Sequence, residues 1–370
     1  MEDRRIIKTF DDLVSIYSPS FGERDLCDCL KAKLEALGAS VWEDNAGDLI
    51  GGNCGNLCAF LPGELPGPPI LLSAHMDTVE PAFGKKAVFN GDTITSEGST
   101  ILGADDASGI AIILEAIERI KESGLPRRSV ELLFPVAEEK YGLGSAVADY
   151  TKLKAKEAFV FDLEGEIGEA ANAAPSIIAF TVSIKGKASH AGFAPLEGIH
   201  AILAASRAVS RIPLGIVAPG LTCNIGTISG GKARNIIPEQ CDITGEIRGF
   251  DHGAALEALE ATKAAFEEEA EAIGATAIFS HKIEITAYET LAESPATLRF
   301  RRACEAEGLP CRIHKTLGGS DNNNFFLHGI EGLVLACSMH NVHSARESAS
   351  LAELEKCVQL TARILTEGTP

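Results

Sequence analysis

The sequence predicts an α/β protein whose mixed, largely parallel sheet is flanked by helices and interrupted by a smaller inserted α+β domain. Short apolar runs that suit buried strands alternate with helical periods over residues 1–174 and again over 289–370. Between them, over residues 175–288, strands alternate apolar and polar residues, as in a half-exposed sheet. Acidic residues and histidines follow several of the buried runs, at the sheet edge where parallel strands bind ligands.

The length and composition favour a two-domain globular protein of the cytoplasm. A chain of 370 residues exceeds what one core usually organises, and its 45% hydrophobic content is ordinary. No apolar run approaches the roughly 20 residues that cross a bilayer, so we expect no membrane partner. The first residues, Met1-Glu-Asp-Arg-Arg, do not open a signal peptide. The 10 cysteines are scattered singly, which predicts buried thiols rather than disulfides.

The formal net charge of −19 argues against a nucleic-acid partner, because the phosphate backbone would repel the chain. The plain interpretation of this charge is solubility. Part of the excess would also arise if carboxylates were gathered to hold cations.

The first part of the chain begins with helical periods and continues with apolar strands. We expect helices at 3–17 and 20–38, strands at 39–44, 56–61 and 69–75, a hairpin at 88–95, a helix at 110–120, and strands at 128–136 and 158–161. Ser18-Pro19 ends the first helix, and Ser20 with Glu23 suggests a capping box for the second. Helices between the strands favour parallel strands with right-handed crossovers.

The middle part predicts a separate small domain. A strand at 178–184 precedes a helix whose apolar face would be Ile199, Ile202, Leu203, Val209 and Ile212. Strands at 221–228 and 241–248, a helix over 256–273 closed by Gly274, and a strand at 277–285 follow. This β-α-β-β-α-β order is the ferredoxin-like unit.

The last part returns to the first pattern. Helices are expected at 294–306, 321–328 and 350–366, with strands at 311–316 and 331–337. The outer domain is therefore discontinuous, because both 1–174 and 289–370 are needed for one sheet.

His75 and Asp77 leave the apolar run Ile70-Leu-Leu side by side, because residues i and i+2 of an extended chain point the same way. A metal-binding histidine usually donates its other ring N–H to a carboxylate or carbonyl, so the pair supplies a ligand and its orienter. Taken alone, a histidine in this position is more often a hydrogen-bonded structural residue.

A larger set of groups shares the same kind of position, at strand ends or in helix-opening loops. The set is His75, Asp77, Asp105, Glu138, Glu139, Asp162 and His343. Converging acids without bases would resist ionising, and no Lys or Arg lies within these motifs. Divalent metal is the economical source of positive charge, and two imidazoles with several carboxylates suit zinc best, with manganese or cobalt as alternatives.

The adjacent pair Glu138-Glu139 suggests a division of labour, because neighbouring residues point in different directions. One would ligate metal while the other takes the proton of a metal-activated water, as in two-metal hydrolases. The plain alternatives are a solvated charged turn for this pair, a helix cap for Asp105-Asp106, and a turn acid for Asp162.

Taken in order, the motifs resemble the two-zinc exopeptidase and amidohydrolase family. The motifs are Ser73-Ala-His-Met-Asp-Thr-Val, Gly103-Ala-Asp-Asp, Glu138-Glu139, Phe161-Asp162 and a late His343. That family includes tripeptidase T, carboxypeptidase G, acetylornithine deacetylase and aminoacylase. Leu102-Gly-Ala-Asp-Asp and Gly318-Gly-Ser-Asp are most similar to peptidase T-like proteins. The resemblance covers nearly the whole chain and implies a zinc exopeptidase fold with an inserted lid or dimerisation domain.

The resemblance implies five ligands for two zinc ions per subunit: His75, Asp105, Glu139, Asp162 and His343. Asp105 would bridge the metals, with His75 and Asp162 on one and Glu139 and His343 on the other. Glu138 would be the general base and then the proton donor, and Asp77 would orient His75.

Outside this set, the resemblance implies that His190 stabilises the tetrahedral oxyanion, from the partner subunit in dimeric members. Asn235 and Arg248 match positions that bind a substrate carboxylate, and Gly319 and Ser320 would shape the substrate pocket. The plain alternatives are a surface-loop histidine, a salt bridge on the polar face of the sheet, and a simple turn before a helix.

The sequence also departs from the family pattern. Ala107 stands where many members carry lysine, which changes the charge beside the metals without removing a ligand. His340 lies close to His343, although the match His343-Ser-Ala-Arg-Glu favours the later histidine.

We therefore expect a metallopeptidase, a dizinc exopeptidase of peptidase T type that cleaves an amide bond of a small peptide and pairs as a homodimer through its inserted domain. Two other functions stay open. One is a deacylase of N-acyl amino acids with the same metal chemistry, and the other is a binding relative that has lost catalysis.

Overall fold

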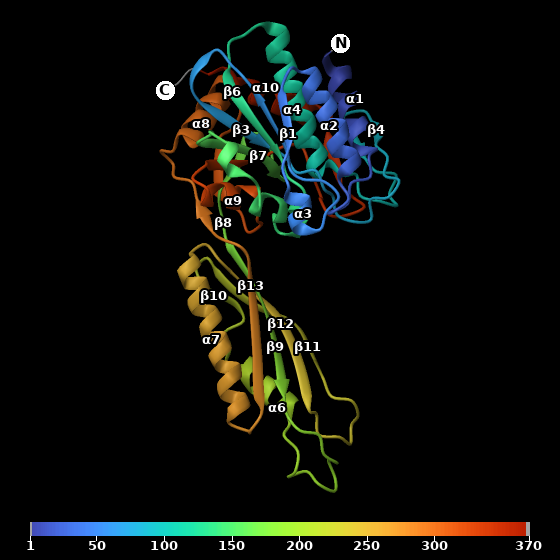
Figure 1. Ribbon diagram of the computed structural model, residues 1–370, viewed down its shortest axis with the longest axis vertical. Helices are drawn as coiled ribbons and strands as arrows, with labels where there is room; N and C mark the ends of the chain where they lie inside the picture. Colours follow the sequence, from blue (N-terminus) through green and yellow to red (C-terminus); the bar gives the residue numbers. More distant parts are fainter. Residues whose placement is uncertain (1, 368–370) are drawn as a thin grey trace. The chain divides into compact units, whose positions relative to one another are not determined.

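The structure is a computed structural model that describes residues 2–367. The described residues form two compact units (Figure 1). Unit 1 contains the residues up to Ala173 and those from Glu289 onward, and unit 2 is Ala174–Tyr288. The domain boundaries expected from the sequence, after residues 174 and 288, lie beside this division.

Unit 1 combines eight helices with the strands of two sheets. Its helices are α1 (Glu2–Val14), α2 (Arg24–Ala36), α3 (Ala46–Ile50), α4 (Ala104–Ser123), α5 (Leu143–Ala146), α8 (Pro295–Glu307), α9 (Asp321–Leu327) and α10 (Leu351–Thr366) among the described residues. The strands of the central sheet are β1 (Ser40–Glu43), β2 (Leu57–Leu61), β3 (Leu65–Ser73), β6 (Arg128–Phe134), β7 (Glu157–Leu163), β8 (Glu169–Ala174), β14 (Tyr288–Glu289), β15 (Arg312–Lys315) and β16 (Glu331–Ala336). A smaller sheet contains β4 (Val88–Asn90), β5 (Thr93–Thr95) and β17 (Ser348–Ser350).

The central sheet is largely parallel, as predicted. Its strands run in the order β1-β2-β6-β3-β7-β16-β8-β14, with β15 on β8. The middle strands β6, β3, β7 and β16 are parallel, whereas β1, β2 and β8 pair antiparallel to neighbours. Because β3 lies between β6 and β7, the carboxyl ends of these three strands meet at one edge.

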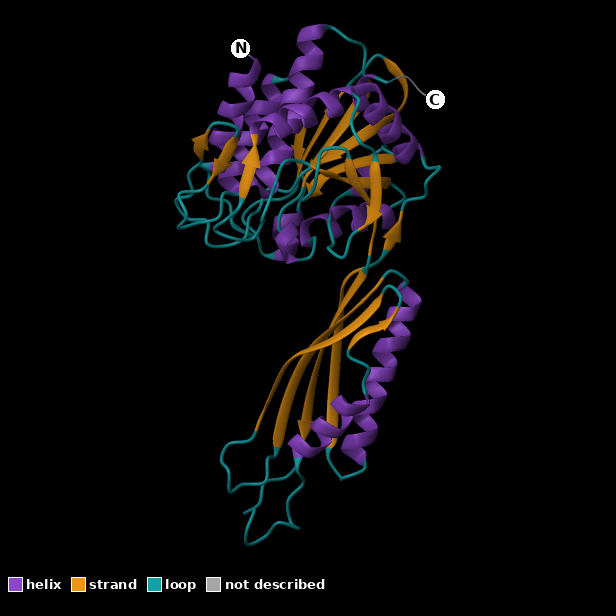
Figure 2. Ribbon diagram, turned by 180° about the vertical axis from the view of Figure 1, so that it is seen from behind, coloured by secondary structure: helices purple, strands orange, loops and turns teal. Residues whose placement is uncertain are grey.

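Both faces of this sheet are covered, which explains its nearly continuous apolar strands. Leu72, Leu132 and Phe159 pack on one face in a core that also contains residues of α1, α2, α4, α8 and α10. Their neighbours along the strands face the other side, where Leu133 packs in a smaller core with Phe325 of α9. Figure 2 shows the helices of unit 1 gathered around the sheet.

Unit 2 has the predicted ferredoxin-like order with one additional strand. Its elements are β9 (Ser176–Lys185), α6 (Ala201–Arg211), β10 (Gly215–Ala218), β11 (Leu221–Gly230), β12 (Gln240–Gly249), α7 (His252–Glu271) and β13 (Thr276–Ile285). The antiparallel sheet runs β10-β11-β12-β9-β13, so the short edge strand β10 is the element that the sequence pattern did not predict.

The buried face of α6 contains alanines besides most of the expected residues. Its buried residues are Ala201, Ala204, Ala205 and Ala208, whereas Leu203 is 41% exposed. Ile212 is buried, and Ile199, Ile202 and Val209 are partly buried against the same core, so of the predicted face Leu203 alone was placed wrongly. The alanines add small side chains that let this helix lie close to the sheet.

The predicted capping box of α2 is wrong. The helix begins at Arg24, and Glu23 stands at its N-cap position without capping it by a side-chain hydrogen bond. Ser20 Oγ donates instead to Asp77 Oδ2, and Glu23 Oε1 accepts from the amides of Phe21 and Ala137. Long-range partners therefore replace the local cap.

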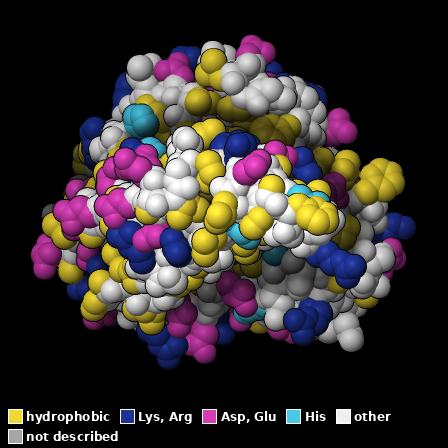
Figure 3. All heavy atoms as spheres, turned by 90° about the horizontal axis from the view of Figure 1, so that it is seen from below, with side chains coloured by type: hydrophobic (Ala, Val, Ile, Leu, Met, Phe, Trp, Pro, Cys, Tyr) yellow, Lys and Arg dark blue, Asp and Glu magenta, His cyan; other side chains and the backbone are white. Residues whose placement is uncertain are grey.

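No helix among residues 2–367 is both long and apolar enough to cross a membrane. On the face drawn in Figure 3, Lys and Arg side chains lie interspersed with Asp and Glu.

Candidate metal centre

Three neighbouring strands of unit 1 bring acidic and imidazole groups together. His75 follows the end of β3, Glu138 and Glu139 lie in a 3₁₀ turn after β6, and Asp162 lies near the end of β7. Ligand atoms of His75, Asp105 and Glu139 lie within 4.8 Å of one another, and so do those of His75, Glu138 and Asp162. The sheet order thus gathers residues that are distant in sequence.

Asp105 stands between the two histidines. Its Oδ1 lies 2.9 Å from His75 Nε2, and its Oδ2 lies 3.2 Å from His343 Nε2. His343 Nε2 also lies 3.0 Å from Glu139 Oε1. Each oxygen of Asp105 therefore faces a different histidine, as the oxygens of a carboxylate bridging two metals would.

The ring of His75 is oriented by the backbone of Asp77. His75 Nδ1 lies 2.8 Å from the Asp77 carbonyl oxygen and 3.5 Å from its carboxylate Oδ1. The Asp77 carboxylate accepts instead from the amides of Glu138 and Glu139, at 2.8 and 3.2 Å. Asp77 therefore connects the end of β3 to the turn that carries the two glutamates.

Asp106 supports the site from behind. Its Oδ2 accepts from the His75 amide at 3.1 Å, and its Oδ1 accepts from the Gly109 amide at 3.1 Å. A Cβ on Gly109 would lie 2.4 Å from Asp106 Oδ1 and 2.7 Å from the Phe161 Cβ. Glycine is therefore required where α4 approaches β7 beside the site.

Glu347 is a functional candidate that the sequence reasoning missed. Its side chain is buried and accepts from the amides of Leu102 and Gly103 at 2.8 Å each, and from that of Asp105 at 3.0 Å. It therefore ties the Asp105 loop to the loop that carries His343. The motif His343-Ser-Ala-Arg-Glu served only to choose between two histidines, and no residue-type pattern marks a glutamate whose partners are distant backbone amides.

The electrostatics of the cluster show an excess of negative charge. Burial raises the pKa of Glu138 well above its ordinary value, and nearby Asp162 adds to the rise. Hydrogen bonds with Asp105 and Glu139 raise the pKa of His343 to about 10. Burial alone would lower the pKa of His75, yet its hydrogen bonds with Asp105 and Asp77 raise it well above the usual value.

In the chain by itself, protons on the two histidines would offset part of this negative charge. Carboxylate oxygens and imidazole nitrogens are also the donors that zinc and similar divalent cations take in proteins. The residues present therefore fit a metal pair, which would supply the same positive charge.

His340 does not belong to this cluster. Its Nε2 lies 2.6 Å from Glu353 Oε2, so His343 is the late histidine that meets Asp105 and Glu139.

The predicted residues of the inserted domain lie in unit 2. His190 is exposed, and its Nδ1 accepts from the amides of Gly192 and Phe193. Exposed Asn235 lies beside this segment, because its carbonyl accepts from the Ala191 amide. Arg248 lies on β12, with Nε 2.8 Å from Glu246 Oε1.

The Gly319-Ser320 pair lies in unit 1 before α9. Gly319 is exposed, whereas Ser320 is buried and caps α9 through a capping box with Asn323. The hydroxyl of Ser320 therefore serves the simple turn before a helix. The next residue, Asp321, accepts a hydrogen bond from Ser145 Oγ through its Oδ1 at 2.5 Å.

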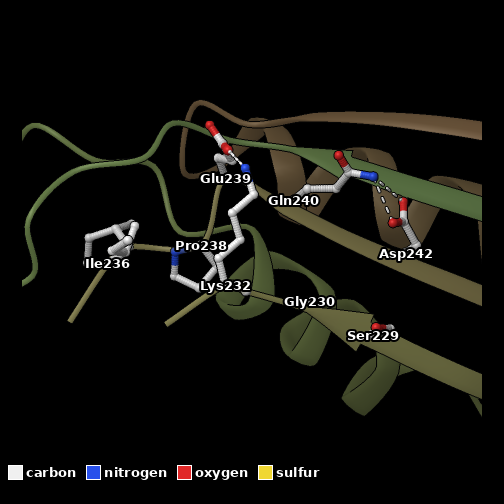
Figure 4. Close-up of a pocket in the computed structure, with 10 residues that line it drawn as sticks. Ser229, Gly230, Lys232, Ile236, Pro238, Glu239, Gln240 and Asp242 are labelled. Atoms are coloured by element: carbon white, nitrogen blue, oxygen red, sulfur yellow. Dashed lines mark hydrogen bonds and ion pairs between the residues drawn. The ribbon is translucent and has the colours of Figure 1, made fainter. Parts of the chain in front are cut away.

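A surface hollow of unit 2 lies along β11 and β12, next to the segment that carries Asn235 (Figure 4). Its charged groups have partners within the hollow: Lys232 Nζ lies 2.5 Å from Glu239 Oε1, and the neutral amide Nε2 of Gln240 donates to Asp242. The residues that line this hollow include the carboxylates of Glu239 and Asp242 but no histidine.

Two family models match the chain. The M20 peptidase dimerisation domain matches residues 172–275, and peptidase family M28 matches residues 56–193. The uncharacterized protein YqjE of Bacillus subtilis is 32% identical over 368 residues, which cover 100% of this chain and 99% of YqjE.

Solved structures resemble the whole chain. Aminopeptidase PepT from Bacillus cereus matches with a TM-score of 0.95 and 33% identity, covering 98% of both chains. A tripeptidase from Staphylococcus aureus matches with a TM-score of 0.95 and 29% identity, also over 98% of both chains. The YXEP protein of Bacillus subtilis, a dinuclear metal binding peptidase from the M20 family, shares the fold at 18% identity, with a TM-score of 0.76 over 98% of this chain and 97% of that one.

Proposed function

This chain belongs to the M20 peptidase family, and from that membership we propose that it is a peptidase T-like metallopeptidase that removes a residue from a small peptide. The observation that carries the proposal is the meeting of His75, Asp105, Glu139 and His343 in one cluster with Glu138 and Asp162, in which His75 and Asp105 are buried. Its relatives with solved structures include an aminopeptidase and a tripeptidase, which supports a peptide substrate.

We assign the ligands to two divalent cations. His75 and Asp162 would hold one cation, Glu139 and His343 the other, and Asp105 both. Zinc suits this donor set best, with manganese or cobalt as alternatives. When bound, such a pair polarises the scissile carbonyl and makes the attacking water more acidic.

Glu138 is the general base in this proposal. It takes the proton of the attacking water and then returns that proton to the leaving amine. Burial raises its pKa, so its carboxylate is a stronger base than a solvated glutamate. Asp77 accepts from the Glu138 amide and orients the ring of His75, so it fixes the position of the proposed base relative to that of a proposed metal ligand.

Residues of unit 2 would bind substrate. His190 would stabilise the oxyanion, and Arg248, with its planar fork, would bind the substrate carboxylate together with Asn235. Gly319, in an exposed turn, would border the pocket, while Ser320 fixes that turn through its helix cap. The match of unit 2 to a dimerisation domain supports a homodimer, which the mass in solution would test.

One experiment tests the function directly. The purified protein is loaded with zinc, its metal content is measured, and it is given tripeptides and N-acetyl amino acids in parallel. We expect about two metal ions per chain, as in two-metal hydrolases, and release of one terminal residue from the tripeptides. A protein that refuses zinc would contradict the metal centre, and turnover of N-acetyl amino acids alone would establish the deacylase instead.

A further inference from the structure

A buried carboxylate without a role in the proposed chemistry lies behind the turn that carries Glu138 and Glu139. Glu23 is 0% exposed, and its Oε1 accepts from the amides of Phe21 at 2.9 Å and Ala137 at 3.0 Å. Ala137 immediately precedes Glu138, so the side chain of Glu23 binds the backbone of the turn that carries Glu138 and Glu139, here called the catalytic turn.

Three consecutive amides of this turn are bound by two carboxylates. The Ala137 amide donates to Glu23, and the next two amides, of Glu138 and Glu139, donate to the two oxygens of Asp77. Ala137 has φ 50°, in the left-handed region that residues with a Cβ rarely adopt. Such a conformation persists only where the surroundings hold it, and here the two carboxylates do so.

The segment that carries Glu23 also holds the end of β3. The Ser18 carbonyl accepts from the Thr78 amide at 2.9 Å, and Ser20 Oγ donates to Asp77 Oδ2 at 2.7 Å. Residues 18–23 therefore bind the ends of β3 and β6, two of the three strands from which residues of the cluster come.

We propose that Glu23 is a positioning residue of the hydrolytic centre: it holds the Ala137 amide, and thereby directs the side chain of Glu139 to the metals and that of Glu138 to the attacking water. The part concerning Glu138 rests on the proposed function, whereas the part concerning Glu139 requires only metal binding.

A second observation separates Glu23 from an ordinary buried acceptor. Its other oxygen, Oε2, is buried and has no hydrogen-bond partner among the described residues. Leaving a buried carboxylate oxygen unpaired costs free energy, and such groups in native structures tend to have a functional reason. Burial, with Asp77 adding to the effect, raises the pKa of Glu23 to about 7.

The test compares three substitutions at Glu23. Glu23→Ala removes the acceptor, Glu23→Asp draws it back by one methylene, and Glu23→Gln keeps an oxygen at the Oε1 position. Zinc affinity is measured by competition with a chelator, and kcat and KM are measured separately on tripeptides. We expect Glu23→Ala to lose roughly 10- to 100-fold in zinc affinity and in kcat, as supporting partners of metal ligands do, with KM little changed. Glu23→Asp should lose less, and Glu23→Gln should stay within about threefold of the unchanged protein.

Glu131 supplies a matched control. It is also a buried glutamate on unit 1 that accepts from two backbone amides, those of Lys154 and Ala155, but these precede β7 rather than the catalytic turn. Glu131→Ala should lower the melting temperature while zinc affinity and kcat of the folded protein remain unchanged.

The outcomes are distinct. Equal zinc affinity and kcat in Glu23→Ala and Glu131→Ala would overturn the proposal, as would a Glu23→Gln protein as impaired as Glu23→Ala. Should Glu23→Ala fail to fold, Glu23→Asp decides, and full zinc affinity with full kcat in that variant overturns the proposal. A protein that binds zinc and cleaves no peptide would end the proposed function, yet Glu23 would still be judged by zinc affinity.

Discussion

Unit 1 buries or half-buries most of its candidate residues, with His343 exposed, whereas unit 2 leaves His190 and Asn235 on its surface. In unit 1, His75, Asp105 and Glu138 belong to a cluster whose backbone is bound by further buried carboxylates. In unit 2, His190 and Asn235 lie exposed on loops. Charges and hydrogen bonds in water contribute little, so exposed groups of this kind act only when a ligand or partner covers them. Unit 1 therefore has a site formed in advance, whereas the residues of unit 2 depend on what binds.

The largest expected effect concerns the pair Glu138-Glu139. Glu138→Gln should lower kcat by about 10²- to 10⁴-fold, because it removes a general base, while zinc content is unchanged. Glu139→Gln should instead lower zinc content, because it removes a ligand. Metal analysis and steady-state kinetics on both variants check this, and a Glu138→Gln protein with ordinary kcat would break the division between base and ligand.

We also expect the hydrophobic cores of unit 1 and unit 2 to unfold independently of each other. Phe180 is buried in unit 2 and stacks on Phe279, with ring centroids 5.6 Å apart. Phe180→Ala should destabilise unit 2 by about 3 to 4 kcal/mol, leaving the zinc content of unit 1 unchanged. Calorimetry with metal analysis measures both, and Phe134→Ala in β6 of unit 1 is the control, expected to reduce zinc binding. Loss of zinc from the Phe180 variant would contradict the independence of the units.

His190→Ala tests whether an exposed residue of unit 2 takes part in the reaction. We expect a loss of about 10²-fold in kcat, the usual cost of removing one oxyanion donor, with zinc content unchanged. His281→Ala, at an exposed position of β13, is the matched control and should retain full activity. Unchanged turnover in the His190 variant would contradict a role for this residue of unit 2 in the reaction.

The smallest effect concerns a buried lysine of unit 1. Lys85 donates to the Ile16 carbonyl at 2.7 Å, and burial lowers its pKa to about 8 from the ordinary 10.5. Between these values the unfolded chain binds more protons than the folded one, so the free energy of unfolding should rise with pH. The rise would be at most about 1.4 kcal/mol per pH unit.

The contribution of Lys85 is measured by chemical unfolding at pH 8, 9 and 10. Lys85→Met should flatten this dependence relative to the unchanged chain. An identical pH slope in both proteins would mean that Lys85 is not the titrating group.

Periodicity predicted much of the architecture because it depends on local burial. The apolar run of β3 and the apolar–polar alternation of β9 each predict one strand. Patterns of this kind also predicted the order of elements in unit 2. The alanines on the buried face of α6 were missed because alanine contributes little to an apolar pattern, although small side chains let a helix lie close to a sheet. Strand β10 was missed because its four residues, Gly215–Ala218, show no alternation of apolar and polar residues.

The candidate ligands could be proposed from the sequence because carboxylates and imidazoles are the side chains that bind such metals. Their supports were not, since Glu23 and Glu347 bind backbone amides that any residue supplies. Glu23 and Ala137 are 114 residues apart, and Glu347 and Asp105 are 242 apart. A local pattern assigned Glu23 to a capping box, and tertiary contacts overrode it.

The discontinuity of unit 1 has a consequence for biosynthesis. Strand β16, which stands between β7 and β8, is translated only after the whole of unit 2. His343 leaves the ribosome 204 residues after Glu139, its neighbour in the folded cluster. The nascent polypeptide consequently carries an incomplete sheet until β16 emerges, and the candidate cluster lacks His343, one of its five proposed ligands, until that residue has been translated.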